Sequence, residues 1–404
     1  MLHLAIIGAG GYAFELIKRI WMIPDKIELI AAVSNPTRKR PGAQVCRDKG
    51  VEVYDSVDEL LDKVQGKCDV IYIPTPINTH SPLTKQVLKA GFDVFMEKPP
   101  TATIQELDNL IEFVRGYNTK VAVCFQYLYT SIMSQMKENI CSGKYGKVKR
   151  VRSISAWERL DNYFSRNSWA GKLRVDGQWV LDGTINNPLA HVLSNDLYLA
   201  SMEPGQMAQP KIVQAELYHV HDIESEDTSS LRVITDNGVE IIFQATLCAN
   251  TVVEPITVVE CEDATIEYKD FNRAYIRFKN GKEEEIRDDT ELRVSMLGQL
   301  ANSYQNRMPF HCTLETCRPF TITVNGAFES SRFTHGIDLK YTSRSKKNNS
   351  IKTIVDNLDE LINAAFEQGK LFSQMQVPWA VRTEPFDVEG YSKFPSETLI
   401  NNGS

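Results

Sequence analysis

The sequence predicts an α/β chain with two domains: a doubly wound parallel sheet at the N-terminus, followed by an α+β domain on a large open, mainly antiparallel sheet. Three observations lead to this prediction. Short apolar runs alternate with helical patterns up to about residue 124, strand-like runs dominate from residue 211 onwards, and 404 residues suffice for two or three domains. Alternating β and α units are typical of a parallel sheet covered by helices. The predicted domains are residues 1–124 and 125–404.

Five apolar runs are the expected strands of the parallel sheet, because strands buried on both faces are apolar throughout. They are Leu2–Ile7, Leu29–Val33, Val70–Ile73, Val94–Met96 and Val121–Cys124. Two intervening helices have recognisable ends. Ser81-Pro82 predicts an N-cap followed by proline, with Gly91 ending that helix, and Thr103-x-x-Glu106 forms a capping box for the next.

The second domain is expected to begin with a helix over Ser131–Cys141 and a strand near Val148–Trp157. The Asn-Gly pairs at 237–238 and 280–281 predict tight hairpins with positive φ at both residues. The further strands are expected at Ile212–His221, Ser230–Thr235, Val239–Leu247, Ile256–Cys261, Thr265–Tyr268 and Tyr275–Phe278. Residues 336–350 resemble a solvated basic connector. An apolar stripe from Ile351 to Phe366 predicts a helix that stops at Gly369 and packs on the body of the protein.

Composition and charge exclude several classes of protein. The net charge of −7 argues against nucleic acid or an anionic membrane as the main partner. No apolar run approaches the roughly 18 residues of a membrane span, and the N-terminus has the pattern of a strand rather than a signal peptide. Eight cysteines without a C-x-x-C spacing predict free thiols in the cytoplasm and no metal site. His219, His221 and His311 receive no role.

The turn after the first predicted strand has the form G-x-G-x-x-A. It places Gly8 at a tight turn, Gly10 where backbone approaches a pyrophosphate, and Ala13 where a helix packs closely on the sheet. Gly11 and Tyr12 open the helix, whose N-terminus stabilises phosphate charge. The pattern predicts a dinucleotide site, and a methyltransferase is the structural alternative.

The end of the second predicted strand bears on the choice of cofactor. An NAD site usually has Asp or Glu here, and neither occurs between Glu28 and Asp48. The residues available for a 2′-phosphate instead are Ser34, Asn35, Thr37 and Arg38, with Lys39 and Arg40 nearby. The sequence therefore favours NADP(H), while NAD(H) and a merely solvated basic loop stay open.

Two further segments carry a family resemblance. Ile-Pro-Thr-Pro-Ile-Asn-Thr-His at 73–80 and Ala-Gly-Phe-Asp-Val-Phe-Met-Glu-Lys-Pro at 90–99, together with the glycine turn, closely resemble the Gfo/Idh/MocA oxidoreductases. That family includes glucose–fructose oxidoreductase and inositol dehydrogenases, and the resemblance covers roughly residues 1–335. It implies an N-terminal Rossmann domain and a C-terminal domain with an open sheet. Members of the family often associate through the exposed face of that sheet, so a homodimer or homotetramer is expected.

The resemblance also implies a site. Cofactor contacts are expected from Thr75, Pro76, Asn78, His80, Glu97 and Lys98. Lys98 is expected beside the nicotinamide and the substrate, where its ammonium would stabilise negative charge on the reacting oxygen. The Lys98-Pro99 bond is expected to be cis.

The family's second signature is an Asp followed four residues later by a His, one helical turn apart. Asp182 matches the Asp, but the His position holds Asn186, and an amide is no general base at neutral pH. Because Asn187 and His191 are again four apart, His191 is expected to transfer the proton, with Asp182 or Asn187 orienting it or binding substrate hydroxyls. The alternative is a structural His191, with Lys98 acting alone or with Asp182.

A polyol substrate suits the aromatic and polar residues nearby. Gln126, Trp169, Lys172, Asn186 and Asn187 are the expected substrate contacts, unless Trp169, like Trp157, belongs to the core. The prediction is an NAD(P)-dependent enzyme that transfers a hydride to or from a secondary alcohol of a sugar, cyclitol or related polyol. Two alternatives remain: a glycoside hydrolase of the same family that uses tightly bound NAD, and a non-catalytic sensor of dinucleotide or sugar.

Overall fold

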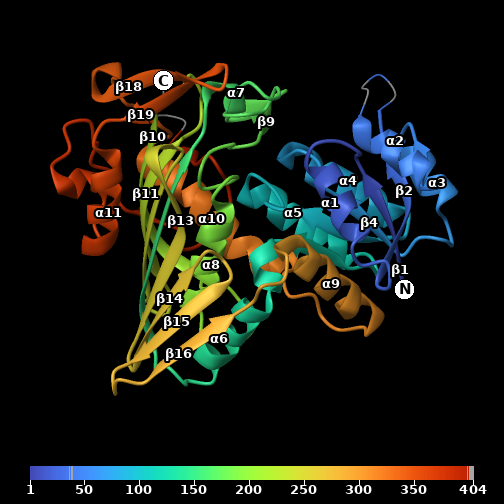
Figure 1. Ribbon diagram of the computed structural model, residues 1–404, viewed down its shortest axis with the longest axis horizontal. Coiled ribbons are helices and arrows are strands. Elements are labelled where there is room, and N and C mark those ends of the chain that lie inside the picture. Colours follow the sequence, from blue (N-terminus) through green and yellow to red (C-terminus); the bar gives the residue numbers. More distant parts are fainter. Residues whose placement is uncertain (36, 38–39, 398, 400–404) are drawn as a thin grey trace. The chain divides into compact units, whose positions relative to one another are not determined.

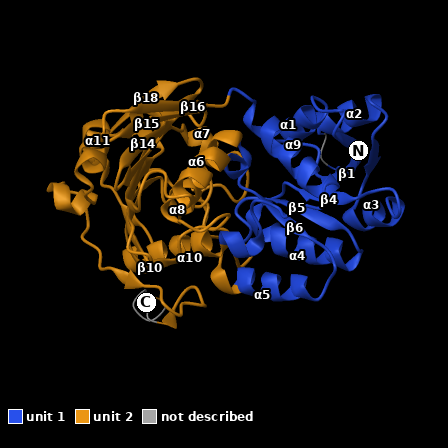
Figure 2. Cartoon of the chain, turned by 90° about the horizontal axis from the view of Figure 1, so that it is seen from below, with its two compact units in different colours: residues 1–101, 106–130, 289–317 blue, residues 102–105, 131–288, 318–404 orange. Residues whose placement is uncertain are grey.

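The computed structural model describes residues 1–35, 37, 40–397 and 399. The chain divides into two compact units, drawn in two colours in Figure 2. The first comprises residues 1–101, 106–130 and 289–317, and the second comprises residues 102–105, 131–288 and 318–404. The predicted boundary after residue 124 does not include the return of residues 289–317 to the first unit.

The first unit contains the parallel sheet. Its strands lie in the order β3-β2-β1-β4-β5-β6, and all are parallel. Strands β2 and β3 are added on one side of β1, and β4, β5 and β6 are added on the other, so the strand order reverses between β1 and β4. The strands are β1 (Leu2–Ile7), β2 (Ile27–Val33), β3 (Glu52–Tyr54), β4 (Val70–Ile73), β5 (Asp93–Glu97) and β6 (Val121–Cys124). The five predicted strands are confirmed, and the short β3 is the one that the apolar pattern missed. In such sheets ligands bind beyond the carboxyl ends of the strands, at the point of reversal.

Helices alternate with these strands. They are α1 (Tyr12–Ile20), α2 (Pro41–Asp48), α3 (Val57–Lys63), α4 (Ile77–Lys89), α5 (Ile104–Arg115) and the short η1 (Gln126–Tyr129). Helix α9 (Leu292–Gln305) joins them from the distant segment and contacts α1 and η1. The start predicted for α4 at Ser81-Pro82 is wrong, because the helix begins at Ile77 and Pro82 lies inside it. Pro82 is the sixth residue of the helix, beyond the first turn, so it supplies no N–H to the backbone bond with the carbonyl four residues earlier.

The second unit is built on a large sheet. In the described part of the chain its ten strands include the path β16-β15-β14-β13-β7-β12-β11-β10-β17, with β20 paired to β10. Only β12–β7 and β10–β17 among these pairs are parallel, so the predicted antiparallel character is confirmed. The strands are β7 (Val148–Glu158), β10 (Pro210–His219), β11 (Thr228–Thr235), β12 (Glu240–Thr246), β13 (Cys248–Cys261), β14 (Ala264–Lys269), β15 (Arg273–Phe278), β16 (Glu283–Arg287), β17 (His335–Gly336) and β20 (Phe386–Asp387).

Helices cover both faces of this sheet's centre (Figure 1). Helix α8 (Ala190–Ala200) lies on one side of β7, β12 and β13, together with α6 (Ser131–Cys141) and α10 (Leu314–Ser331). Helix α11 (Leu358–Gln368) packs against the same three strands from the other side, where Leu358, Ile362 and Phe366 are buried. Over the central strands this face is therefore covered by a helix of the same chain, and self-association through the sheet stays a prediction.

The segment before α11 differs from the prediction. Residues expected to form a basic connector and the start of a helix instead form an antiparallel hairpin, β18 (Thr342–Lys347) with β19 (Ser350–Val355). Only Leu358–Gln368 is helical, and it ends at Gly369 with φ of 63°, as expected. The β-branched residues Ile351, Thr353 and Val355 alternate with period two, which suits a strand better than a helix.

The two Asn-Gly turns form hairpins, but positive φ occurs at the glycine alone. Gly238 has φ of 81° and Gly281 has φ of 87°. Each turn has three residues between its flanking backbone pairs, Thr235 with Val239 and Phe278 with Lys282. Such loops place a single left-handed residue after a turn, so only the glycine needs that conformation.

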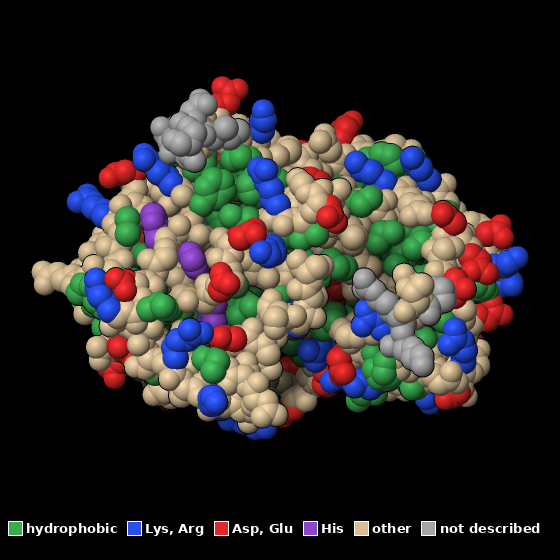
Figure 3. All heavy atoms as spheres, turned by 90° about the horizontal axis from the view of Figure 1, so that it is seen from above, with side chains coloured by type: hydrophobic (Ala, Val, Ile, Leu, Met, Phe, Trp, Pro, Cys, Tyr) green, Lys and Arg blue, Asp and Glu red, His purple; other side chains and the backbone are tan. Residues whose placement is uncertain are grey.

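No helix within the described residues has the length and apolarity needed to cross a membrane. All eight cysteines are free thiols, as predicted. On the face drawn in Figure 3, acidic and basic side chains are interspersed rather than gathered by sign.

Candidate functional site

The glycine turn after β1 has the geometry of a dinucleotide cradle. Gly8 has φ of 130°, and a Cβ there would lie 3.3 Å from that of Ala13. A Cβ on Gly10 would lie 2.6 Å from Cδ of Arg40, so a side chain at Gly10 would fill the space above the turn. Gly11 has φ of 55°, and α1 starts directly after it. The turn therefore offers bare backbone N–H groups and a helix N-terminus at the reversal point of the sheet, which fits a pyrophosphate.

The residues after β2 lie at the neighbouring strand end. Ser34 is buried and donates its backbone N–H to Tyr54 O. The Asn35 side chain accepts from Thr37 N at 2.9 Å and from Thr37 Oγ1 at 2.7 Å. Arg38 and Lys39 lie outside the described residues. Arg40 immediately precedes α2 and stands beside Gly10.

The predicted cofactor residues after β4 divide into two groups. Thr75, Pro76 and Asn78 are half-buried, and Pro76 caps the start of α4. His80 is completely buried, and its two ring nitrogens lie 2.8 Å from the carbonyl oxygens of Pro99 and Thr75. His80 thus connects the loops after β4 and β5, and its contact with the cofactor stays a prediction.

Glu97 and Lys98 end β5 at the same edge of the sheet. Glu97 is buried, accepts a 2.8 Å hydrogen bond from Tyr72 Oη, and burial raises the pKa of its carboxyl to about 6. The Lys98 side chain is half-buried, and its backbone N–H also bonds Glu97. The Lys98-Pro99 peptide is cis, as expected. The Glu97 carboxyl thus accepts both from Tyr72 of β4 and from the backbone of Lys98.

Gln126 and Arg293 gather at the glycine turn. Tyr12 donates to Gln126 Oε1 at 3.4 Å, and the Arg293 guanidinium lies 5.5 Å from the centre of the Tyr12 ring. Burial raises the pKa of Tyr12 well above its usual value, so the phenol stays protonated. Gln126, predicted to contact substrate, is buried here against the turn. Arg293 was missed because α9 is distant in sequence and carries no motif.

In the second unit, the segment with the predicted Asp–His signature is not a helix at Asp182. Residues 183–189 form successive turns, and α8 begins only at Ala190. The prediction that Asp182 and Asn186 share a helical face is therefore wrong. Leu181 has a positive φ of 47°, and Pro188 lacks the N–H that a helix would need.

Asp182 is buried at the centre of a polar network. It accepts from Asn187 Nδ2 at 2.6 Å and from the backbone N–H of Gly171 at 2.8 Å. Arg166 Nη2 lies 3.7 Å from the same carboxylate, a partner that sequence spacing could not reveal. Asn186 points elsewhere and donates to Val180 O at 3.2 Å. The carboxylate thus orients Asn187, while Asn186, buried to 1% exposure, supports the turn.

Glu226 holds the turns that follow Asp182, and nothing in the sequence indicated this role. Its carboxylate accepts from Ile185 N at 3.0 Å, from Thr184 Oγ1 at 3.2 Å and from Ser225 Oγ at 2.7 Å. A Cβ on Gly183 would come within 1.9 Å of Glu226 Oε2, so only glycine fits there. Burial raises the pKa of Glu226 to about 7.

The remaining predicted residues lie around the same turns. His191 is in the first turn of α8 and half-buried, with its carbonyl accepting from Ser194 Oγ. Trp169 is half-buried with Arg166 5.0 Å from its ring centre, and Lys172 Nζ pairs with Glu224 at 2.8 Å. Trp157 donates to Glu254 at 3.1 Å. Lys172 is thus tied to the loop that carries Glu226.

Comparison with known proteins bears on this architecture. Residues 2–125 match the family described as "Oxidoreductase family, NAD-binding Rossmann fold", Gfo/Idh/MocA. The chain is 27% identical over 156 residues to a dTDP-3,4-didehydro-2,6-dideoxy-alpha-D-glucose 3-reductase of Streptomyces violaceoruber, covering 38% of this chain and 43% of that protein. It is 27% identical over 149 residues to D-glucoside 3-dehydrogenase of Escherichia coli, covering 36% and 41%. The matched part thus spans less than half the length of either relative.

Solved structures extend the likeness in fold to more of the chain. The WlbA dehydrogenase from Bordetella pertussis, in complex with NADH and UDP-GlcNAcA, superposes with a TM-score of 0.67 at 18% identity over 82% of this chain and 96% of that one. Levoglucosan dehydrogenase in complex with NADH has a TM-score of 0.70 at 15% identity, with the same coverage. With its glycine turn and its Glu-Lys-Pro strand end, the N-terminal part of the chain, residues 2–125, matches the Gfo/Idh/MocA oxidoreductase family.

Proposed function

We propose that the protein is a nicotinamide-dependent oxidoreductase acting on a secondary alcohol, or the corresponding ketone, of a sugar, cyclitol or related polyol. The observation that carries the proposal is the Gly8–Ala13 turn after β1 with Lys98 directly after β5, both at the carboxyl edge of the parallel sheet, where β4 separates the two strands. The relatives named for glucosides and deoxysugars support the substrate class.

The cofactor fits residues already described. Gly8, Gly10, Gly11 and the start of α1 would hold its pyrophosphate, and the loops at Thr75–Asn78 and Lys98 would hold its nicotinamide half. When bound, the nicotinamide supplies or accepts the hydride. Lys98 donates a hydrogen bond from its ammonium to the reacting oxygen and stabilises the negative charge that develops there.

The second unit supplies the proton-transfer group in this proposal. His191 accepts the hydroxyl proton during oxidation and returns it during reduction, a role suited to an imidazole near neutral pH. Asp182 holds Asn187 in place at 2.6 Å, and the Asn187 carbonyl oxygen and the Trp169 and Lys172 side chains bind substrate hydroxyls.

For the cofactor's adenosine end we keep the sequence-based proposal of NADP(H). No carboxylate follows β2 up to Asp48, and Ser34, Thr37 and Arg38 are the candidates for the 2′-phosphate. NADH in the structural neighbours favours the alternative, NAD(H).

The decisive experiment is a screen of the purified full chain with NAD+, NADP+ and their reduced forms against sugars, inositols and their keto derivatives. Reduced-nicotinamide absorbance is the readout, and Lys98→Met is the matched variant. Turnover that Lys98→Met abolishes supports the proposal. Cofactor binding without turnover on any polyol contradicts it, and release of an aglycone from glycosides without net cofactor change would instead indicate redox-assisted hydrolysis.

We also propose that any self-association uses surfaces other than the centre of the large sheet, which α11 covers. Light scattering after size exclusion measures the oligomer, and a dimer broken by a substitution on β7 or β12 contradicts this.

A further inference from the structure

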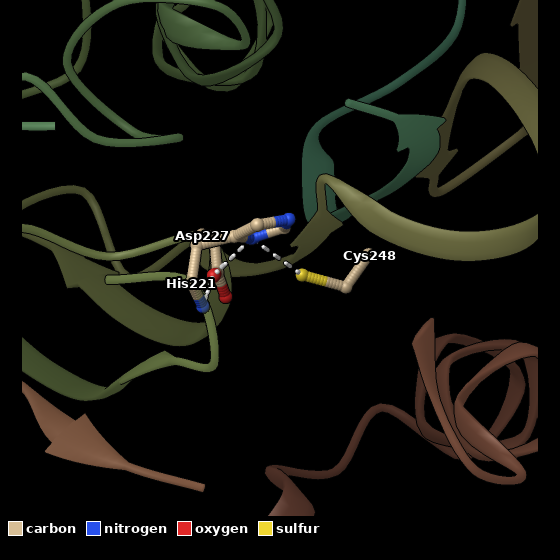
Figure 4. Close-up of side chains that lie close together, drawn as sticks. All are labelled: His221, Asp227 and Cys248. Carbon is tan, nitrogen blue, oxygen red and sulfur yellow. Dashed lines mark hydrogen bonds and ion pairs between the residues drawn. The ribbon is translucent and has the colours of Figure 1, made fainter. Parts of the chain in front are cut away.

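Three potential metal ligands converge inside the second unit (Figure 4). His221 and Asp227 lie near the two ends of the loop between β10 and β11, and Cys248 is the first residue of β13. All three side chains are buried, and their ligand atoms lie within 4.8 Å of one another. Residue spacing gave no sign of this group, because Cys248 lies 27 positions from His221.

The distances suit a single small cation. His221 Nδ1 is 2.8 Å from Asp227 Oδ2 and 3.6 Å from Cys248 Sγ. Two ligands of a tetrahedral zinc ion, each about 2.0–2.3 Å from the metal, lie roughly 3.3–3.7 Å apart. The sulfur–nitrogen spacing already matches, and the nitrogen–oxygen pair needs to open by about half an ångström.

The other nitrogen of His221 supplies independent support. Nε2 is buried, has no hydrogen-bond partner among the described residues, and lies 3.6 Å from Asp161 Oδ1. If the single proton of a neutral ring sits on Nδ1 to bond Asp227, a lone pair on Nε2 faces a carboxylate. A metal on Nδ1 moves that proton to Nε2, where it points at Asp161. Metal-binding histidines commonly donate their second N–H to a carboxylate in this way.

The surrounding contacts hold each ligand in place. Asp227 accepts from the backbone N–H groups of Val220 at 2.9 Å and His221 at 3.0 Å. Thr228 Oγ1 donates to its other oxygen at 3.2 Å. Asp161 is itself paired with Arg344 of β18 at 3.0 Å, and the Phe164 ring lies 4.5 Å from the His221 ring. The ligands are therefore oriented before any ion arrives.

We propose that His221, Asp227 and Cys248 form a binding site for one divalent transition metal, zinc by its donor set of imidazole, carboxylate and thiolate. Binding releases the thiol proton to solvent, the Nδ1 proton of His221 moves to Nε2, and a water completes a tetrahedral sphere. The ion ties the β10–β11 loop to β13. Because this loop also carries Glu226, which bonds the turns around Asp182, the metal strengthens the support beneath the candidate substrate segment.

The test uses the full chain, freed of metal with a chelator and titrated with Co²⁺ as a spectroscopic substitute for zinc. We expect a thiolate-to-cobalt charge-transfer absorption that saturates at one equivalent, disappears in Cys248→Ser, and persists in Cys261→Ser, a buried cysteine at the other end of β13. Asp161→Asn should keep the absorption and weaken metal affinity about 10–100-fold. Zinc should raise the melting temperature of the wild type and not that of His221→Asn.

The competing arrangement is a doubly protonated His221 between Asp161 and Asp227. In that case native mass spectrometry of the wild type finds no bound zinc at one equivalent, no charge-transfer absorption appears, and imidazole nitrogen NMR shows a cationic ring. Any of these results with folded wild-type protein overturns the proposal, and none depends on a variant that could fail to fold.

Discussion

Asp182 and Asn187 are joined by a 2.6 Å hydrogen bond from the Asn187 amide to the Asp182 carboxylate. The bond spans the turns that replace the expected helix, and the same carboxylate receives Gly171 N–H and faces Arg166. A buried carboxylate with three donors around it is an acceptor that orients its neighbours. This relationship fits the predicted role of Asp182 as a residue that orients its neighbours, and that role stays a prediction.

We expect Asn187→Ala to lower kcat about 10–100-fold while cofactor affinity stays unchanged, because the proposed substrate-binding amide is lost and Asp182 loses a donor. Steady-state kinetics with the substrate found in the screen provides the measurement. Asn162→Ala, an exposed asparagine in the same unit, is the control and should retain wild-type kinetics. Equal kinetics for both variants would remove Asn187 from the site.

Gly183→Ala should destabilise the protein by about 1–3 kcal/mol, because its Cβ would overlap the Glu226 carboxylate at 1.9 Å. Chemical denaturation gives the free energy of unfolding. Gly116→Ala is the matched control, since its Cβ would meet only Phe113 O at 3.4 Å, and it should change stability by less than about 0.5 kcal/mol. A Gly183→Ala variant as stable as Gly116→Ala contradicts the close approach of Glu226.

Asp196 predicts how stability depends on pH. It is fully buried in α8 and accepts from Ser153 and from Thr257 Oγ1, and burial raises the pKa of its carboxyl to about 7. The pKa of Asp196 in the folded protein lies above the ordinary value of 3.8. The protonated carboxyl therefore makes its full contribution to the free energy of unfolding below about pH 4, and this contribution is lost as pH rises through 7.

Asp196→Asn should therefore raise the free energy of unfolding at pH 8 by up to a few kcal/mol and gain little at pH 4. Denaturation curves at both values measure the difference. Asp25→Asn, an exposed carboxyl, serves as the control for a general charge effect. A gain of the same size at both pH values would show that the Asp196 carboxyl does not titrate in the folded protein.

His191→Asn should lower kcat about 10²–10⁴-fold and remove or shift the acid limb of the pH–rate profile. Lys98→Met should be at least as damaging, and the double variant should lose less than the product of both, because the proposed mechanism has the two groups act on one proton-transfer step. Melting temperatures measured alongside identify unfolded variants. Near-normal turnover in a folded His191→Asn would assign the role to Lys98.

Arg38→Ala should weaken NADP(H) binding by about 1.5–3 kcal/mol, the size of a charge-assisted hydrogen bond, and leave NAD(H) almost unchanged. Fluorescence titration of the reduced cofactors measures both affinities. Equal losses, or tighter binding of NAD(H) by the wild type, would exclude the 2′-phosphate assignment.

The sequence by itself determined the parallel sheet, the dinucleotide turn and the family resemblance of the N-terminal part. These features depend on residues close in sequence: continuous apolar runs specify strands buried on both faces, and G-x-G-x-x-A specifies a turn that a side chain would fill. Local patterns also placed Lys98 at a strand end and Gly369 at the end of a helix. These patterns failed where the apolar residues fit both the two-residue repeat of a strand and the 3.6-residue repeat of a helix. In β19 the sequence predicted a helix, and the segment is a strand.

Only the tertiary structure decided which distant side chains meet. Arg166 with Asp182, Glu226 with Gly183, Arg293 with Tyr12, and His221 with Cys248 are brought together by strand pairing and loop packing. Their spacings along the chain carry no period, because a polar contact across a sheet depends on register and on the course of the connecting loops. Burial decided the rest, since it raised the carboxyl pKa values of Asp196 and Glu226, and a sequence does not show which carboxyls lose their water.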